Sequence, residues 1–463
     1  MVFSSLTFLS FFFPCVLALY YLLRSRRYRN MTLLAASLLF YSWGEPKALL
    51  VLLGVSLAAY LGALAVDRTR PRPGLCRAFF VGTVTLIVLN LFVFKYLGFA
   101  LRELGRLAPG LRDLPAPALP IGISFFTFQA LSYVIDLYRK RIKLQRSFLD
   151  LLLYISLFPQ LIAGPIVRYA DVERELLLRR ETPEEVWLGL RRFMEGLAKK
   201  VILANNIALI CEAVVHGHAA VAGTLAWWLA ALAYTLQIYY DFSGYSDMAI
   251  GLGRIFGFHF PENFDRPYGA LSITEFWRRW HISLSSWFRD YVYIPLGGNR
   301  VSRPRWIYNL LIVWLLTGLW HGAAWNFILW GLYYALLLIG EKLLWGKWIE
   351  QAPKPLRWLY CFLLVTLGWV LFYHSDMTGL TAALTGMFQP AGTSLSALVS
   401  DPRLLLGMPF LAVGLLFLLP VGKLLERHRP PVWLDVCVHL FLLGTSVLLI
   451  LSSGYNPFIY FRF

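Results

Sequence analysis

The sequence predicts an all-α polytopic membrane protein with about 11–12 transmembrane helices, plus amphipathic helices that re-enter the membrane or lie on its surface. The first observation is the composition: 58% of the 463 residues are hydrophobic and only 15% are charged, whereas globular domains carry about 25% charged residues. The second is that the apolar residues form long runs separated by short basic loops. We therefore expect residues 1–463 to form one multi-pass membrane domain.

Basic residues are concentrated in the loops between these runs. The formal net charge is +17, and loops 24–30, 67–77 and 139–146 are rich in arginine and lysine. The positive-inside rule places such loops in the cytoplasm, which puts both chain termini outside. Because the charges do not gather on one soluble face, the sequence predicts no nucleic-acid partner. Membrane lipid is the expected partner of this surface.

Apolar runs mark the predicted crossings. They are residues 2–23, 31–66 with a hairpin turn at Gly44–Pro46, 78–100, 121–138, 201–215, 222–240, 306–321, 323–341, 357–374, 404–420 and 432–452. Lys95 lies near the end of one run, where it is expected to snorkel to the interface. The nearly uncharged loop 375–403 should lie outside.

Two further segments differ from simple spans. Pro159, Gly164 and Pro165 interrupt an apolar run, and a broken helix is tolerated where it is buried in protein or lines a cavity. An ordinary kinked span is the alternative. Residues 171–200 are densely charged in both signs, which favours a helix at the cytoplasmic surface.

His321 is the first candidate for chemistry. It lies between two apolar runs, and an ionisable residue placed so deep in apolar sequence is a functional hypothesis by default. A hydrogen-bonded packing histidine is the alternative. Trp320 and Trp325 are expected to pack around it and exclude water, and Gly322 leaves the backbone open to close approach.

His281 is the second candidate, within a segment that has the pattern of one amphipathic helix from Phe276 to Tyr291. The apolar stripe at helical spacing consists of Phe276, Trp280, Leu284, Trp287 and Tyr291. His281 lies at the edge of that stripe. Such a helix lies in the interface or re-enters the membrane, and a purely structural interfacial histidine is the alternative.

Polar residues near the two histidines are weaker candidates. Arg278 and Arg279 suit the phosphates of a CoA donor, although anchoring to anionic lipid explains them equally well. Asn326 can hydrogen-bond an acyl carbonyl. Asp241 and Asp247 flank a Gly-Ser-Tyr turn, and we expect each to pair with an arginine.

The chemistry that these residues suit is O-acyl transfer. It needs a base to take a proton from a hydroxyl, and donors that stabilise an oxyanion. A buried imidazole is neutral and can accept that proton. There is no GxSxG nucleophile motif, and neither histidine has a metal-type partner three or four residues on. We therefore predict no metal and no permanently bound cofactor.

The remaining histidines and the cysteines are expected to be loop or packing residues. They are His216, His218, His259, His374, His428 and His439, and Cys15, Cys76, Cys211, Cys361 and Cys437. The cysteines form no pair at metal or redox spacing.

Ordered stretches along nearly the whole chain resemble the bacterial branch of the membrane-bound O-acyltransferase family, and most closely its alginate-acetylating membrane subunits. They include MVFSSLTFLSFFFP, LPIGISFFTFQALSYVIDLYR, FPQLIAGPIVRYADV, QIYYDFSGYSDMAIGLGRIFGFHFPENFDRPY, FWRRWHISLSSWFRDYVYIPLGGNR and LTGLWHGAAWNFILWGLYY. The resemblance implies tilted helices around a central tunnel. It matches His321 to the essential histidine of the family and His281 to the second one.

The resemblance also implies a reaction and its setting. An acetyl group would pass from acetyl-CoA in the cytoplasm, across the bacterial inner membrane, for O-acetylation of an exported polysaccharide such as alginate. Relatives of this type commonly work with a secreted or membrane-anchored Ser-His-Asp acyltransferase, which we expect here as a protein partner. Transfer of D-alanine or another acyl group to a cell-wall polymer is one alternative, and a transporter without acyl chemistry is another.

Overall fold

The computed structural model describes residues 1–111, 114–217, 223–389, 400–418 and 431–452. The regular elements in these ranges are helices, with one isolated β-bridge between Phe264 and Trp280. The chain clusters into two compact units. Unit 1 comprises Met1–Phe193 and Met248–Pro261, and unit 2 comprises Met194–Asp247 and Glu262–Phe463. The predicted all-α class is confirmed.

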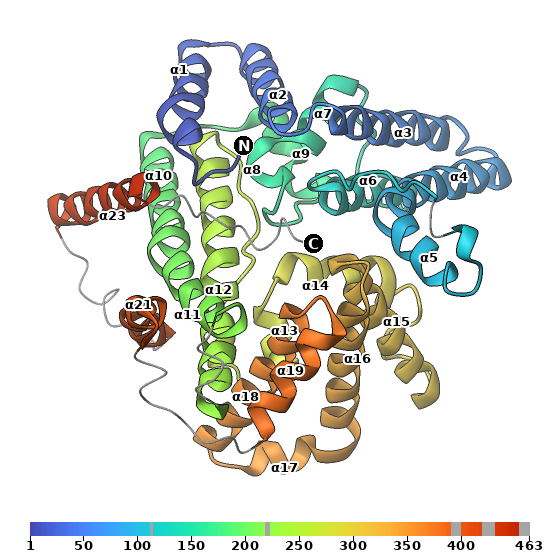
Figure 1. The fold of residues 1–463 in the computed structure, drawn as a ribbon. Helices are drawn as coiled ribbons and strands as arrows, with labels where there is room; N and C mark the ends of the chain where they lie inside the picture. The colour runs from blue at the N-terminus through green and yellow to red at the C-terminus, as the bar shows by residue number, and fades with distance from the viewer. Residues whose placement is uncertain (112–113, 218–222, 390–399, 419–430, 453–463) are drawn as a thin grey trace. The chain divides into compact units, whose positions relative to one another are not determined.

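Unit 1 contains the first helices of the chain (Figure 1). They are a π-helix Phe8–Phe12, α1 (Phe13–Leu22), α2 (Arg26–Ser42), α3 (Ala48–Arg68), α4 (Pro73–Leu91), a π-helix Phe92–Tyr96, α5 (Leu97–Leu104), a 3-10 turn Pro109–Leu111, α6 (Ile123–Tyr138), α7 (Phe148–Ser156), α8 (Phe158–Leu161), α9 (Tyr169–Leu178) and most of α10 (Pro183–Ala198). A turn at residues 43–47 separates α2 from α3, where Gly44–Pro46 predicts it, but α2 is not among the helices that are long and apolar enough to cross a membrane.

Close packing of α3 against α4 depends on a glycine. A Cβ atom added at Gly62 of α3 would overlap the side chain of Thr83 on α4. The helix α6 packs against both, and almost every one of its side chains is buried. Figure 1 shows these three helices side by side. The predicted crossing 121–138 therefore lies inside the protein rather than against lipid.

Lys95 corrects one prediction of the sequence. Its side chain does not snorkel to an interface: the residue is 9% exposed, and its Nζ donates a hydrogen bond to Ser124 Oγ over 2.9 Å. A hydroxyl on the adjoining helix α6 gives the ammonium group a partner within the protein, so it need not reach water.

The segment around Pro159 takes the broken form. The short helix α8 ends at Leu161, and residues 162–168 are irregular. Ile162, Ile166 and Val167 are nevertheless buried. Irregular backbone is tolerated at this kind of position because protein, not lipid, surrounds it.

Unit 2 contains the remaining elements. They are the last turn of α10, a π-helix Lys199–Ala204, α11 (Asn205–Val215), α12 (Thr224–Ile255, which ends in unit 1), a 3-10 turn Pro267–Gly269, α13 (Ile273–Arg279), α14 (Ile282–Phe288), a π-helix Arg289–Tyr293, α15 (Arg303–His321), α16 (Trp325–Gly340), a π-helix Glu341–Trp345, α17 (Gly346–Gln351), α18 (Lys354–Tyr373), α19 (Met377–Phe388), α21 (Pro402–Leu418) and α23 (Val432–Ser452).

The helix α12 corrects the predicted turn near Gly244. The helix runs unbroken through this residue, where a Cβ atom would lie 2.7 Å from the carbonyl oxygen of Gly196. Gly244 therefore serves close packing of two helices rather than a turn. The predicted arginine partners of Asp241 and Asp247 are also wrong. Lys200 Nζ lies 2.5 Å from Asp241 and Lys199 Nζ lies 2.6 Å from Asp247.

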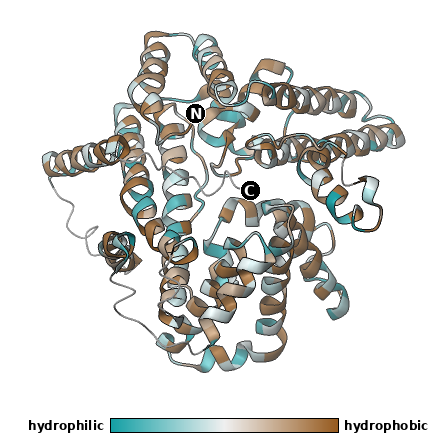
Figure 2. Ribbon diagram, viewed as in Figure 1, coloured by the Kyte–Doolittle hydropathy of each residue, from teal (hydrophilic) through white to brown (hydrophobic). Residues whose placement is uncertain are grey.

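Within the described ranges, five helices are long and apolar enough to cross a membrane. They are Ala48–Arg68, Pro73–Leu104, Trp325–Gln351, Lys354–Tyr373 and Val432–Ser452, and shorter apolar helices occur at Phe8–Leu22, Met377–Phe388 and Pro402–Leu418. Figure 2 shows apolar residues over most of α3 and α4, where Leu50 is 72% exposed and Leu86 is 55% exposed. Such apolar outer surfaces suit contact with lipid.

The packing of α15 against α16 positions the end of α15, which contains His321. Gly318 of α15 faces Gly331 of α16, and a Cβ atom at Gly318 would lie 3.6 Å from the Cα atom of Gly331. These two helices therefore pack backbone to backbone.

The predicted outer loop 375–403 contains the helix α19, which buries Leu380, Ala383 and Met387. That segment is therefore not a simple loop.

Candidate active site

His281 lies at a break between two helices, which corrects the continuous helix predicted from Phe276 to Tyr291. The helix α13 ends at Arg279 and α14 begins at Ile282. Between them, Trp280 is extended and pairs with Phe264, and His281 has a φ of +45°. Left-handed backbone is uncommon outside glycine. The predicted apolar stripe is nonetheless fully buried, because both short helices keep it on the same side.

Asn263 holds the backbone and the ring of this break. The residue is completely buried. Its Oδ1 accepts hydrogen bonds from the Ser283 backbone N–H (3.3 Å) and the Ser283 hydroxyl (2.8 Å), and lies 3.0 Å from Nδ1 of His281. Its own backbone oxygen accepts from the N–H of Ile282. With Nδ1–H donating to Asn263, the ring is the tautomer whose Nε2 carries the lone pair.

The two candidate histidines share one aromatic neighbour, Trp320. The ring centroid of Trp320 lies 5.8 Å from that of His281 and 4.9 Å from that of His321. Both histidines are buried, with 1% and 4% of their surface exposed. His321 is the last residue of α15. The structure therefore brings the two residues singled out from the sequence into one buried aromatic environment.

Other aromatic rings complete the surroundings of His321. Trp330 of α16 and Phe372 of α18 each lie 5.1 Å from its ring. Trp325, which the sequence predicted to exclude water from the site, is 46% exposed. That prediction is wrong because Trp325 is the first residue of α16. Trp330, more than one turn further along the same helix, packs against the imidazole instead.

Gly322 permits the close approach that the sequence predicted. A Cβ atom at this position would overlap the ring of Phe327. The backbone of Gly322 is extended, with φ −173°, so strain is not the reason for glycine here. Space is the reason, and any larger residue must displace Phe327 or the end of α15.

The side-chain amide of Asn326 is hydrogen-bonded to the end of α18. Its Nδ2 donates to the backbone oxygens of Phe372 (3.2 Å) and Leu371 (3.5 Å) at the end of α18. These carbonyls are among the last four of the helix, which have no partner within the helix. The amide therefore caps α18, and it does not have its N–H groups ready for an acyl carbonyl as the sequence suggested.

Arg278 and Arg279 differ in their surroundings. Arg279 forms an ion pair with Glu275 over 2.5 Å, one turn earlier in α13. Arg278 is exposed. Of the two candidates for a phosphate contact, Arg278 is the more exposed, and Arg279 is paired with Glu275.

Unused hydrogen-bond donors lie near His321, and the sequence reasoning missed them. The indole N–H groups of Trp277 and Trp330 and the hydroxyl of Tyr334 are buried, with no hydrogen-bond partner in the described part of the chain. The ring centroid of Trp330 lies 5.5 Å from that of Trp277 and 5.2 Å from that of Tyr334. Leaving such a donor dry costs about 1–3 kcal/mol.

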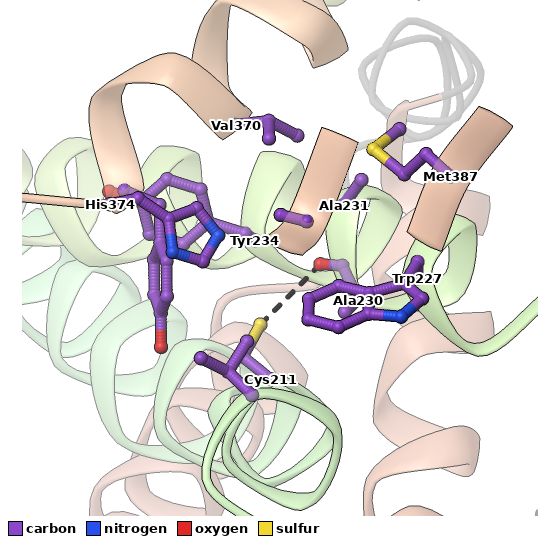
Figure 3. A pocket seen from close by; sticks show the side chains of 11 residues that line it. Cys211, Trp227, Ala230, Ala231, Tyr234, Val370, His374 and Met387 are labelled. Atoms are coloured by element: carbon purple, nitrogen blue, oxygen red, sulfur yellow. Dashed lines mark hydrogen bonds between the residues drawn. The ribbon is translucent and has the colours of Figure 1, made fainter. Parts of the chain in front are cut away.

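A separate small cavity, with a volume of about 20 Å³, lies in the same unit. Cys211, Tyr234 and His374 are among the side chains that line it (Figure 3). The Sγ atom of Cys211 is hydrogen-bonded to the Ala230 carbonyl, as the dashed line shows. Neither candidate histidine lines this cavity, but Phe372, two residues before His374, contacts His321. The end of α18 thus separates the cavity from His321.

The other histidines occupy varied positions. His259 contacts Glu175 and His439 contacts Glu195, while His218 and His428 fall outside the described residues. Among the residues that the structure describes, no three His, Cys, Asp or Glu side chains gather as metal ligands would.

Comparisons with known proteins place the chain in a family. Residues 136–383 match the model of the MBOAT, membrane-bound O-acyltransferase family. The chain is 39% identical over 488 residues to the probable alginate O-acetylase AlgI of Pseudomonas putida, with both chains covered completely. It is 42% identical to its counterpart in Pseudomonas aeruginosa, over 81% of this chain and 73% of that protein. It is also 32% identical to the peptidoglycan O-acetyltransferase of Helicobacter pylori, over 100% of this chain and 98% of that protein.

Proposed function

Because the chain belongs to the membrane-bound O-acyltransferase family, we propose that it moves an acetyl group from acetyl-CoA, across the inner membrane, for O-acetylation of an exported polysaccharide such as alginate. It is an O-acyltransferase and a multi-pass membrane protein. The observation that carries the proposal is the pair of buried histidines around Trp320, in a chain that aligns end to end with an alginate O-acetylase.

In the proposed mechanism His321 is the general base. Its neutral imidazole takes the proton of an attacking hydroxyl, whose oxygen forms a bond to the thioester carbonyl carbon. The carbon–sulfur bond then breaks, and the CoA sulfur leaves with the proton that the imidazole returns. A positioned general base contributes about 10²–10⁴ in rate. The aromatic rings around His321 support this role because they keep water from competing with the acceptor.

The developing oxyanion needs donors, and Trp330 is the best placed. Its ring lies against His321, and its buried N–H has no partner among the described residues. A donor held in place before the reaction stabilises negative charge at no reorganisation cost. This role replaces the one that the sequence suggested for Asn326, whose amide N–H groups are used by α18.

His281 acts as an orienting residue or secondary proton carrier in this scheme. Its contact with Asn263 sets the tautomer, and Trp320 lies between the two imidazoles in the chain of ring contacts. Arg278 is the proposed contact for a donor phosphate. A Ser-His-Asp acyltransferase outside the membrane would complete transfer to the polymer.

One assay separates this proposal from its alternatives. The purified chain in proteoliposomes receives acetyl-CoA labelled in the acetyl group, and free thiol and label are both followed. We expect thiol release that depends on an acceptor, and polysaccharide acetylation only after the partner acyltransferase is added. Label that crosses the membrane with CoA intact would indicate a transporter, and activity with a D-alanyl thioester alone would indicate wall-polymer alanylation.

A further inference from the structure

Glu341 holds the start of the helix that leads to His281. It is the first residue of the π-helix that follows α16. Its Oε1 accepts the backbone N–H of Ile273 over 2.7 Å, and its Oε2 accepts the backbone N–H (3.0 Å) and the hydroxyl (2.8 Å) of Thr274. The first N–H groups of a helix have no partner within that helix. One carboxylate from another part of unit 2 therefore satisfies two of these groups in α13.

The carboxylate of Glu341 is itself held in place. Tyr360 of α18 donates its hydroxyl proton to Oε1 over 3.3 Å, and the Tyr360 oxygen accepts the indole N–H of Trp345 over 2.9 Å. Gly340 leaves room for the ring of Trp345, which a Cβ atom at this position would overlap. Contacts from α18 and from the π-helix thus orient the group that holds the start of α13.

The helix α13 depends on such contacts for its position. It has 7 residues, and helices shorter than about 12–15 residues are marginal on their own. Ring contacts of Trp277 with Trp330 and Tyr334 hold its buried face. The hydrogen bonds to Glu341 hold its first turn. Because hydrogen bonds require a specific distance and angle, they fix where α13 begins.

His281 lies just beyond the other end of α13, in backbone that its surroundings must hold. Its φ is +45°, and such a conformation persists only where neighbouring groups fix it. After the break, Asn263 accepts the backbone N–H groups of Ile282 and Ser283. Before the break, about 10 Å of helix separates His281 from Thr274. A displacement at the start of this short helix is therefore carried to the imidazole.

We propose that Glu341 is a positioning residue for the reaction, which acts through His281 by fixing the start of α13. The inference rests on the proposed function, because His281 takes part in a reaction only in that scheme. Glu341→Gln keeps the size of the side chain, but the amide nitrogen cannot accept a hydrogen bond. Either Ile273 or Thr274 then loses its acceptor, and the first turn of α13 shifts.

The test is a double-mutant cycle of Glu341→Gln with His281→Gln in the full-length protein in proteoliposomes. Acceptor-dependent thiol release from acetyl-CoA gives kcat. Glu341→Gln should lower kcat about tenfold or more, since misplacement by about 1 Å can cost about 10²-fold. In the His281→Gln background the same change should have no further effect, because two residues that act through one group do not add.

Glu45→Gln is the matched control. Glu45 also accepts a backbone N–H just before a helix, that of Ile121 over 3.2 Å, but this helix, α6, contains neither candidate histidine. Turnover of Glu45→Gln should stay near that of the unmodified protein. Hydrogen–deuterium exchange is the second measurement, and the N–H groups of Ile282 and Ser283 should exchange faster in Glu341→Gln than in Glu45→Gln.

Thr274→Val keeps the test decisive if Glu341→Gln does not fold. It removes only the hydroxyl contact, at an exposed position, and should give a smaller loss of turnover that also disappears in the His281→Gln background. Normal turnover in a folded Glu341→Gln protein would overturn the inference. A loss of the same factor with and without His281 would also overturn it, because it would show a role in folding alone. No thiol release from the unmodified protein would refute the proposed function, and the inference with it.

Discussion

Replacing Asn263 by alanine should impair the reaction through His281. The amide oxygen of Asn263 accepts from both donors of Ser283 and contacts Nδ1 of His281, while its Nδ2 donates to Ser246 over 3.0 Å. If two of these groups are left buried without a hydrogen-bond partner, at a cost of about 1–3 kcal/mol each, the variant loses at least about 2 kcal/mol of stability. The freed imidazole also loses its fixed tautomer, and misplacement by about 1 Å can cost about 10²-fold in rate.

Asn309→Ala is the matched control for this prediction. Asn309 is as fully buried as Asn263, but its Nδ2 donates to the backbone oxygens of Leu296 and Gly298. The temperature of thermal unfolding in detergent should be lower than that of the unmodified protein in both variants. Thiol release per folded molecule should fall about 10–100-fold only in Asn263→Ala, with the KM for acetyl-CoA little changed. Equal turnover in the two variants would refute the idea that Asn263 positions a residue of the reaction.

Three further predictions concern packing, charge and topology. Gly322→Ala should displace Phe327 and lower the free energy of unfolding by about 1–3 kcal/mol through overpacking, as measured by thermal unfolding. Gly82→Ala is the control, because the space around Gly82 is open, and it should leave stability unchanged or raise it. Equal losses of stability in the two variants would argue against a steric role for Gly322. Lys200→Met should lower the free energy of unfolding by about 3–5 kcal/mol, because it leaves the buried carboxylate of Asp241 without its ion-pair partner. Lys200→Met/Asp241→Leu should recover much of that stability. Unchanged stability in Lys200→Met would show that the ion pair contributes nothing. A cysteine at position 27 in a cysteine-free background should resist impermeant thiol reagents in intact cells, and labelling there would reverse the predicted orientation.

The sequence predicted the fold class and the main candidates because both depend on composition and local pattern. Apolar runs mark helices whatever their partners, and an imidazole between two such runs is conspicuous. The stripe from Phe276 to Tyr291 was predicted as the apolar face of one interfacial or re-entrant helix, and the structure buries all five of its residues. The break at His281 was not predicted, because it depends on pairing between Trp280 and Phe264, a tertiary contact that helical periodicity does not encode.

Partners of buried polar groups were the hardest feature to predict. Lys95 pairs with a serine on another helix, and the two aspartates of α12 pair with lysines rather than arginines. Asn326 was a candidate for binding an acyl carbonyl, but its amide caps α18. Asn263 and Trp330 were missed for the same reason, although an asparagine between Phe260 and Phe264 was a signal that a buried polar contact was needed.

The central claim is that the imidazole of His321 performs proton transfer, and His321→Asn tests it most directly. Asparagine keeps a polar side chain of similar bulk but cannot take the proton. The measurement is acceptor-dependent release of free CoA by the purified variant, with circular dichroism and thermal unfolding as controls for folding. We predict a fall of about 10²–10⁴-fold with the fold intact. Near-normal CoA release from a well-folded His321→Asn protein would show that the imidazole is structural, and the proposed mechanism would then be wrong.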